Sequence, residues 1–152
     1  MVTGIDLIKE MIRIASGYPL RYRQRDVEME GVAIECRINA EDPSDGFRPS
    51  PGLINLYIPP GGNGVRVDSH IYTGYRIPSH YDSLIGKLIV HKPNRREAIA
   101  CMRRALDEFT VEGIKTTIPF YKELFGHSHF IKGQVDTGFV EREFFHGNRP
   151  EE

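Results

Sequence analysis

Apolar residues recur at helical spacing near the N-terminus. A cap at Thr3, answered by Asp6 three residues later, predicts the start of a helix, and Gly17 and Pro19 predict its end. The apolar positions of this helix cover most of its circumference: Ile5, Leu7, Ile8, Met11, Ile12, Ile14 and Ala15. A helix that faced solvent on most sides would need less apolar surface, so we expect another part of the protein to cover it.

The pattern changes to short strands between about Arg21 and His91. Four runs are alternating, β-branched or continuously apolar, at residues 32–39, 53–58, 65–72 and 84–90. Proline, glycine, serine and aspartate separate these runs at residues 43–46, 49–52 and 59–64. Because no helical pattern lies between the strands, we expect antiparallel pairing.

Helical spacing returns after Asn94, a candidate cap that Glu97 can complete. One face of this helix is apolar and consists of Ile99, Met102, Leu106 and Phe109. A short apolar segment at 110–114 leads to further helices near 118–125 and 138–145, and residues 146–152 are expected to fray. The pattern therefore predicts an α+β fold, with an antiparallel sheet of short strands flanked by helices.

Composition narrows the function classes. The chain has 152 residues, of which 39% are hydrophobic and 27% charged, as is usual for one globular domain. A balance of 20 basic against 21 acidic residues argues against a general nucleic-acid binder. No apolar run is long enough for a membrane span and no signal peptide is recognisable, so we expect a cytoplasmic protein. Cys36 and Cys101 lie on predicted core faces, which indicates neither a disulfide nor a zinc site.

Several short motifs have a plain structural interpretation. The run Gly61-Gly62-Asn63-Gly64 lacks the Lys-Ser/Thr of a phosphate loop and is better read as a hairpin turn. Three residues of triad type, His80, Asp82 and Ser83, are too close in sequence to converge from separate elements.

Two further clusters are also ambiguous. His127 and His129 could share a metal ion, but two histidines without carboxylate or cysteine support are more often exposed turn residues. Arg95, Arg96, Arg103 and Arg104 are typical of a solvated helix face.

The predicted strand 32–39 carries the most informative polar residue. Its alternation places Val32, Ile34, Cys36 and Ile38 on one face and Ala33, Glu35, Arg37 and Asn39 on the other. Arg37 is then part of either an ordinary solvated strand face or a binding site for an anion. Its planar guanidinium can donate hydrogen bonds to two oxygens of an anion at once. The pattern alone favours the solvated face.

Six blocks of sequence resemble, in the same order, the C-terminal part of the biotin carboxylase family. They are TGIDLI (3–8), ECRINAEDP (35–43), PSPG (49–52), PGGNGVR (60–66), YDSLIGKL (81–88) and EGIKT (112–116). The resemblance extends from Met1 to about Phe145 and implies membership of a family of three-domain ATP-grasp ligases. These enzymes use ATP and Mg²⁺ to activate bicarbonate and then carboxylate N1 of biotin on a biotin carboxyl carrier protein. This is the first half-reaction of acetyl-CoA carboxylase in fatty acid synthesis.

The family's glycine-rich lid and a segment resembling NTRxQVEHxVTE are not found in this sequence. The resemblance therefore implies a C-terminal fragment that is inactive by itself and binds ATP, Mg²⁺ and biotin only weakly. Residues 1–20 are expected to pack on the rest of the carboxylase chain, residues 21–145 to form the C-terminal domain, and the parent to be a homodimer. The same module occurs in pyruvate and propionyl-CoA carboxylases. A non-catalytic binding or dimerisation module is the alternative.

The resemblance also assigns roles to individual residues. Arg37 matches a family arginine that holds bicarbonate and then stabilises the enolate-like oxygen of deprotonated biotin, which reverses the preference from pattern alone. Glu35 and Asn39, on the same face, are expected to orient its guanidinium, with Asp82 as a weaker support. Arg66 aligns with a region of the homodimer contact. No metal ligand is expected in this chain.

Overall fold

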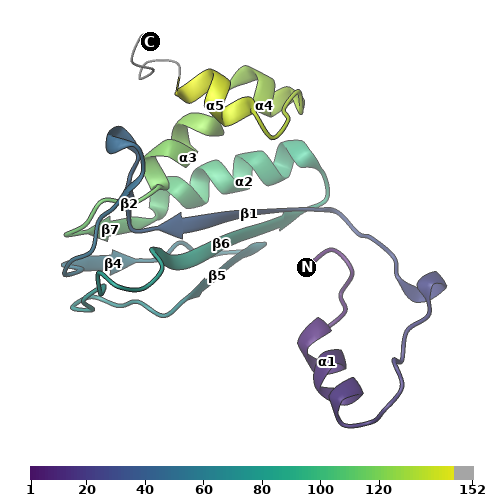
Figure 1. Cartoon of the computed structure of the whole chain (residues 1–152). Helices are drawn as coiled ribbons and strands as arrows, with labels where there is room; N and C mark the ends of the chain where they lie inside the picture. The colour runs from purple at the N-terminus through teal and green to yellow at the C-terminus, as the bar shows by residue number, and fades with distance from the viewer. Residues whose placement is uncertain (146–152) are drawn as a thin grey trace, which may run out of the picture.

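The computed structural model describes residues 1–145; the predicted frayed segment 146–152 lies outside them. Figure 1 shows helices α2 to α5 above a small sheet and α1 below it, at the end of a long N-terminal arm. The helices are α1 (Leu7–Ala15), α2 (Arg95–Glu108), α3 (Ile118–Leu124), α4 (Ser128–Lys132) and α5 (Phe139–Phe144), with 3₁₀ turns at Gln24–Asp26 and Pro43–Asp45. The strands are β1 (Val32–Asn39), β2 (Glu41–Asp42), β3 (Arg48–Pro49), β4 (Leu56–Ile58), β5 (Val65–Ser69), β6 (Leu84–Lys92) and β7 (Thr110–Glu112).

The largest sheet is antiparallel and has the strand order β1-β6-β5. In this sheet Cys36 of β1 lies opposite Leu88 of β6, and Val67 of β5 lies on the other side of Leu88. Two small antiparallel pairs, β2-β3 and β4-β7, complete the strands. These strands and the helices around them confirm the predicted α+β class.

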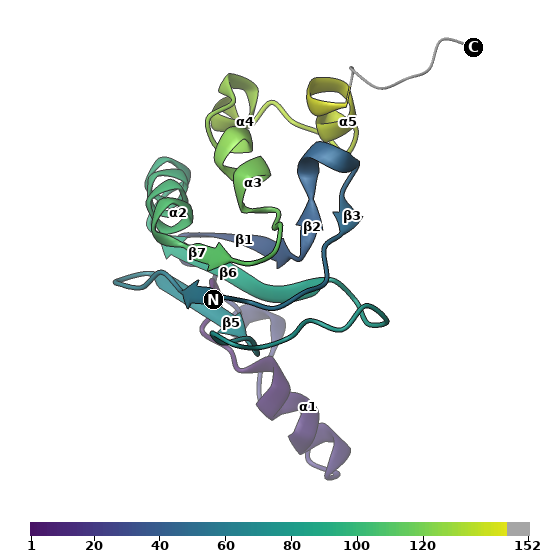
Figure 2. The same cartoon turned by 90° about the vertical axis from the view of Figure 1, so that its left-hand side faces the viewer.

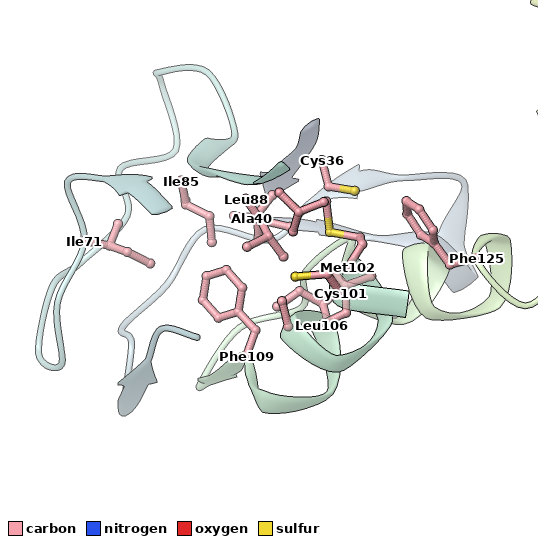
Figure 3. Close-up of a cluster of buried hydrophobic side chains, with 14 of the residues drawn as sticks. Cys36, Ala40, Ile71, Ile85, Leu88, Cys101, Met102, Leu106, Phe109 and Phe125 are labelled. Carbon is pink, nitrogen blue, oxygen red and sulfur yellow. The ribbon is translucent and has the colours of Figure 1, made fainter. Parts of the chain in front are cut away.

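The core lies between this sheet and α2. Alternation along β1 leaves Cys36 and Ile38 buried, and they meet the apolar face predicted for α2. Met102 and Leu106 are completely buried there. Figure 3 shows both side chains within the cluster of core residues. Asn94 caps α2 as predicted, because its side-chain oxygen accepts a hydrogen bond from the Glu97 amide at 3.0 Å. No helix within residues 1–145 has the length and apolar character needed to cross a bilayer.

Helix α1 begins later than predicted and is not covered. Its N-cap is Asp6, whose carboxylate accepts from the Lys9 amide at 2.9 Å, so the predicted cap at Thr3 is wrong. The reason is Gly4, whose φ of +64° cannot continue into a helix. Five large apolar residues of α1 are more than half exposed: Leu7, Ile8, Met11, Ile12 and Ile14. The expected covering surface is not found among residues 1–145.

The glycine-rich run 61–64 does not form a hairpin. It connects β4 to β5, which belong to different sheets. Gly64 has a φ of +78°, and a Cβ at this position would lie 2.5 Å from the backbone oxygen of His91. The run is therefore a crossing between sheets that requires glycine where it passes β6.

Two further details differ from the sequence interpretation. The segment around His127 and His129, expected to be a turn, contains the short helix α4. Arg95 is not simply solvated, because its guanidinium lies over the Phe130 ring at 5.0 Å and donates to the Phe130 carbonyl. The second difference comes from this contact between α2 and α4.

Candidate active-site face

Arg37 lies on the side of the sheet that faces away from α2. Its neighbours in β1, Cys36 and Ile38, point into the core, so alternation directs Arg37 outward, where its side chain is 56% exposed. Figures 1 and 2 both place α1 on the side of the sheet opposite α2. The outward arginine and the uncovered apolar helix therefore lie on the same side of the molecule.

Charged residues from three strands share this outer face. The register places Lys87 of β6 opposite Arg37, and Asp68 of β5 opposite Lys87. Directly opposed residues in an antiparallel pair point to the same side, so these three form a row across the sheet. A second row runs beside it and consists of Glu35, Ile89 and Arg66. The sequence pattern did not identify Lys87, because its position opposite Arg37 depends on strand register.

Asp82 is the ionic partner of Arg37. Its Oδ2 lies 3.8 Å from Nη2 of Arg37, and its side chain is 73% exposed. That separation is longer than a hydrogen bond, and an exposed pair of this kind contributes little to stability. Asp82 therefore lies within reach of the guanidinium while the N–H donors remain available to a ligand.

Asn39 and Glu35 make contacts other than the predicted ones. The amide nitrogen of Asn39 donates to Oε1 of Glu41 at 3.0 Å, and Ser83 donates to the same oxygen. The amide oxygen of Asn39 is buried and has no donor among residues 1–145. Glu35 shares the outer face with Arg37, and its charge adds to the larger effect of Asp68 in raising the pKa of Arg66. Orientation of Arg37 by Asn39 and Glu35 stays a prediction.

The backbone beneath Arg37 is held by a residue that the sequence pattern does not indicate. Thr117, which is buried just before α3, donates its hydroxyl to the Arg37 carbonyl at 3.2 Å. The same hydroxyl accepts from the Asn39 amide at 3.0 Å. These bonds connect the end of β1 to the start of α3 and so fix the position from which the Arg37 side chain leaves the sheet.

Arg66, the predicted dimer contact, is held by a neighbour on its own strand. Its Nε and Nη2 donate to the two carboxylate oxygens of Asp68, each at 2.8 Å. The bidentate contact lowers the pKa of Asp68, and the positive charge of Lys87 adds to this effect. Arg66 is thus presented in a defined orientation on the outer face.

Within the part of the chain that the structure describes, the outer face has no cluster of three potential metal ligands. Among residues 1–145, the one group of three potential metal ligands is His127, His129 and Glu143, in the helical layer on the other side of the sheet. The outer face offers cationic and hydrogen-bonding groups for a small anion instead.

Comparison with known proteins identifies close relatives. The family model for the biotin carboxylase C-terminal domain matches residues 35–142. Biotin carboxylase 1 of Bacillus subtilis is 60% identical over 141 residues, which are 93% of this chain and 31% of that protein. A pyruvate carboxylase subunit from Methanothermobacter thermautotrophicus is 53% identical over 141 residues, which are 93% of this chain and 29% of that protein.

Solved structures agree with these matches. The biotin carboxylase domain dimer of the Hydrogenobacter thermophilus 2-oxoglutarate carboxylase, in complex with MgADP, ADP and bicarbonate, matches with a TM-score of 0.93 and 45% identity. The match covers 99% of this chain and 33% of that one. The biotin carboxylase of Campylobacter jejuni, in a β,γ-ATP complex, matches with a TM-score of 0.88 and 48% identity over 94% of this chain and 32% of that one.

These relatives are about three times as long as the part that matches, so the chain spans about a third of their length. The family model covers most of this chain and includes Arg37 in β1 and the whole of β5 and β6. The chain therefore belongs to the biotin carboxylase C-terminal domain family.

Proposed function

We propose that this chain forms one wall of the active site of an ATP-dependent biotin carboxylase, in which Arg37 binds bicarbonate. The observation that carries the proposal is the placement of Arg37: an outward cation on a hydrogen-bonded strand, with Lys87 opposite it and only a long contact to Asp82. The family membership of the chain supports the same role.

The chemistry of Arg37 follows from its fixed charge. Its planar fork can donate two hydrogen bonds to the oxygens of bicarbonate. When N1 of biotin loses its proton, negative charge develops on the ureido oxygen, and a cation already in place stabilises that charge without reorganisation. Lys87 adds positive potential on the same row of the outer face.

ATP and Mg²⁺ belong to the proposed reaction, where they supply the activation of bicarbonate. We assign the binding of both groups to the rest of the proposed carboxylase. The carrier protein is the proposed donor of biotin. Named relatives include biotin carboxylases, a 2-oxoglutarate carboxylase domain and a pyruvate carboxylase subunit, so the proposed activity is the biotin carboxylation step that these names share.

Dimerisation is proposed through the β5 region. Arg66 is exposed and held by Asp68, and a solved relative is described as a dimer. Cytoplasmic location stays a prediction for this chain; the Arabidopsis thaliana relative is named as chloroplastic.

The test is Arg37→Ala in the complete carboxylase. We expect biotin-dependent turnover to fall about 10²- to 10³-fold, as for loss of one oxyanion donor, with ATP affinity nearly unchanged. Arg103→Ala, an exposed arginine on α2, is the matched control and should leave turnover unaltered. Turnover in Arg37→Ala equal to that of the control would rule out the role of Arg37 and favour the alternative of a non-catalytic module.

A further inference from the structure

The segment from α4 to α5 brings together three side chains that sequence spacing did not connect. His127 and His129 lie at the start of α4, and Glu143 lies in α5. One potential ligand atom from each residue falls within 4.8 Å of the other two, and Nε2 of His127 is 3.4 Å from Oε2 of Glu143. In the sequence, the two histidines have no carboxylate beside them. The fold supplies that carboxylate.

The central ligand of this cluster is held by aromatic packing. The His127 ring contacts the rings of Phe139, Phe144 and His129, with centroids 5.1, 5.9 and 5.3 Å away. Phe139 is buried and anchors α5 in turn. Only 27% of the His127 side chain is exposed, so its ring is kept near one orientation instead of turning freely in solvent.

The donor set has the charge and chemistry of a site for a divalent transition metal. Two imidazoles and one carboxylate carry a net charge of −1 when the histidines are neutral, and a three-ligand set of this kind suits Zn²⁺. The nearby Arg142 does not compete for Glu143, because its Nη2 is paired with Asp136 at 2.9 Å. We propose that His127, His129 and Glu143 form a zinc site that links α4 to α5.

Each ring nitrogen of His127 has its own neighbour. Nδ1 accepts a hydrogen bond from the His129 amide at 3.3 Å, and Nε2 faces the Glu143 carboxylate. Nε2 is therefore the ring nitrogen placed to bind a metal together with Glu143.

The consequence of the site is a cross-link between two short helices. Helix α4 has five residues and α5 has six, and helices of this length are not stable by themselves. A metal that binds only the folded arrangement stabilises it in proportion to its saturation.

Zinc titration of the metal-free 152-residue chain by isothermal calorimetry tests the proposal. We expect one Zn²⁺ per chain and no binding of Mg²⁺, which prefers oxygen ligands. His129→Ala and Glu143→Gln each remove a ligand and keep the His127 side chain. Each should weaken zinc binding at least about tenfold, because loss of a residue that only hydrogen-bonds a metal ligand already costs about that much affinity. His80→Ala removes an exposed histidine elsewhere and should bind zinc like the parent chain.

The readouts separate binding from folding. The melting temperature of the parent chain should rise with zinc concentration, and this rise should be lost in both ligand variants, while far-ultraviolet circular dichroism without zinc should be the same in all four proteins. The proposal is overturned if the parent chain binds no stoichiometric zinc, or if His129→Ala and Glu143→Gln bind it as tightly as His80→Ala does.

Discussion

Neighbouring residues of β1 occupy opposite environments. Arg37 is exposed on the outer face, whereas Cys36 is 2% exposed in the core. Burial raises the pKa of the Cys36 thiol to about 12, and the negative charge of Glu35 adds to the shift. At the residue scale, strand alternation thus separates a group proposed to bind an anion from one that must stay neutral.

The raised pKa of Cys36 predicts a loss of stability in alkali. The unfolded thiol ionises near pH 9, its ordinary value, while the folded thiol keeps its proton to about pH 12. Above pH 9 the unfolded state therefore binds fewer protons than the folded state, and the free energy of unfolding should fall as the pH rises toward 12. Urea titrations from pH 7 to 11 measure this slope.

One substitution isolates the contribution of Cys36. Cys36→Ala should flatten the alkaline slope, although it lowers stability at pH 7 by leaving a small cavity. Tyr121, whose pKa burial also raises to about 12, adds to the slope, and because the Cys36 charge contributes to that shift, this part becomes smaller in Cys36→Ala as well. An unchanged slope in Cys36→Ala would contradict the assignment.

At the scale of elements, α2 is the helix whose boundaries follow most directly from its sequence. Asn94 accepts from the Glu97 amide, and its own side-chain nitrogen donates to the Glu97 carboxylate at 2.7 Å. The apolar face then meets β1 and β6 in the core. Local capping and helical spacing are sufficient to predict this helix, because β1 and β6, on which its apolar face packs, belong to one small sheet.

Removal of this cap gives a prediction for α2. Asn94→Ala should lower the free energy of unfolding by about 1 kcal/mol, since the first turn loses its side-chain acceptor. Arg96→Ala, on the exposed side of the same turn, should change it by less than about 0.5 kcal/mol. Urea unfolding monitored by circular dichroism compares the two. An equal effect of both substitutions would show that the cap contributes nothing specific.

At the scale of the whole molecule, the apolar face of α1 remains exposed beside the charged outer face of the sheet. Ile8 and Ile12 are 64% and 62% exposed. The arm that carries them is tied to itself by Arg21, which donates to the Glu10 carboxylate from Nε at 2.7 Å. Because the relatives are about three times longer than the matching part, we expect the rest of the carboxylase to cover both surfaces.

Substitution of this helix distinguishes an uncovered face from a covered one. In the 152-residue chain, Ile8→Glu together with Ile12→Glu should change the free energy of unfolding by less than about 0.5 kcal/mol per site. In the complete carboxylase the same pair should lower the melting temperature, because the carboxylates would be buried without partners.

A core substitution provides the reference for this comparison. Met102→Ala, at a completely buried position, should cost about 2–5 kcal/mol in the 152-residue chain. If the α1 pair destabilised that chain as strongly as Met102→Ala does, the face would have to be covered within the chain itself.

The sequence by itself determined the alternating faces of β1, the apolar stripe and cap of α2, and the family, because each depends on neighbours in the chain. Only the tertiary structure decided that Lys87 lies opposite Arg37 and that Glu143 completes the histidine pair of α4. It also decided that Asn39 bonds Glu41. Strand register and helix packing bring together residues that are distant in sequence, and local periodicity does not indicate which of those residues become neighbours.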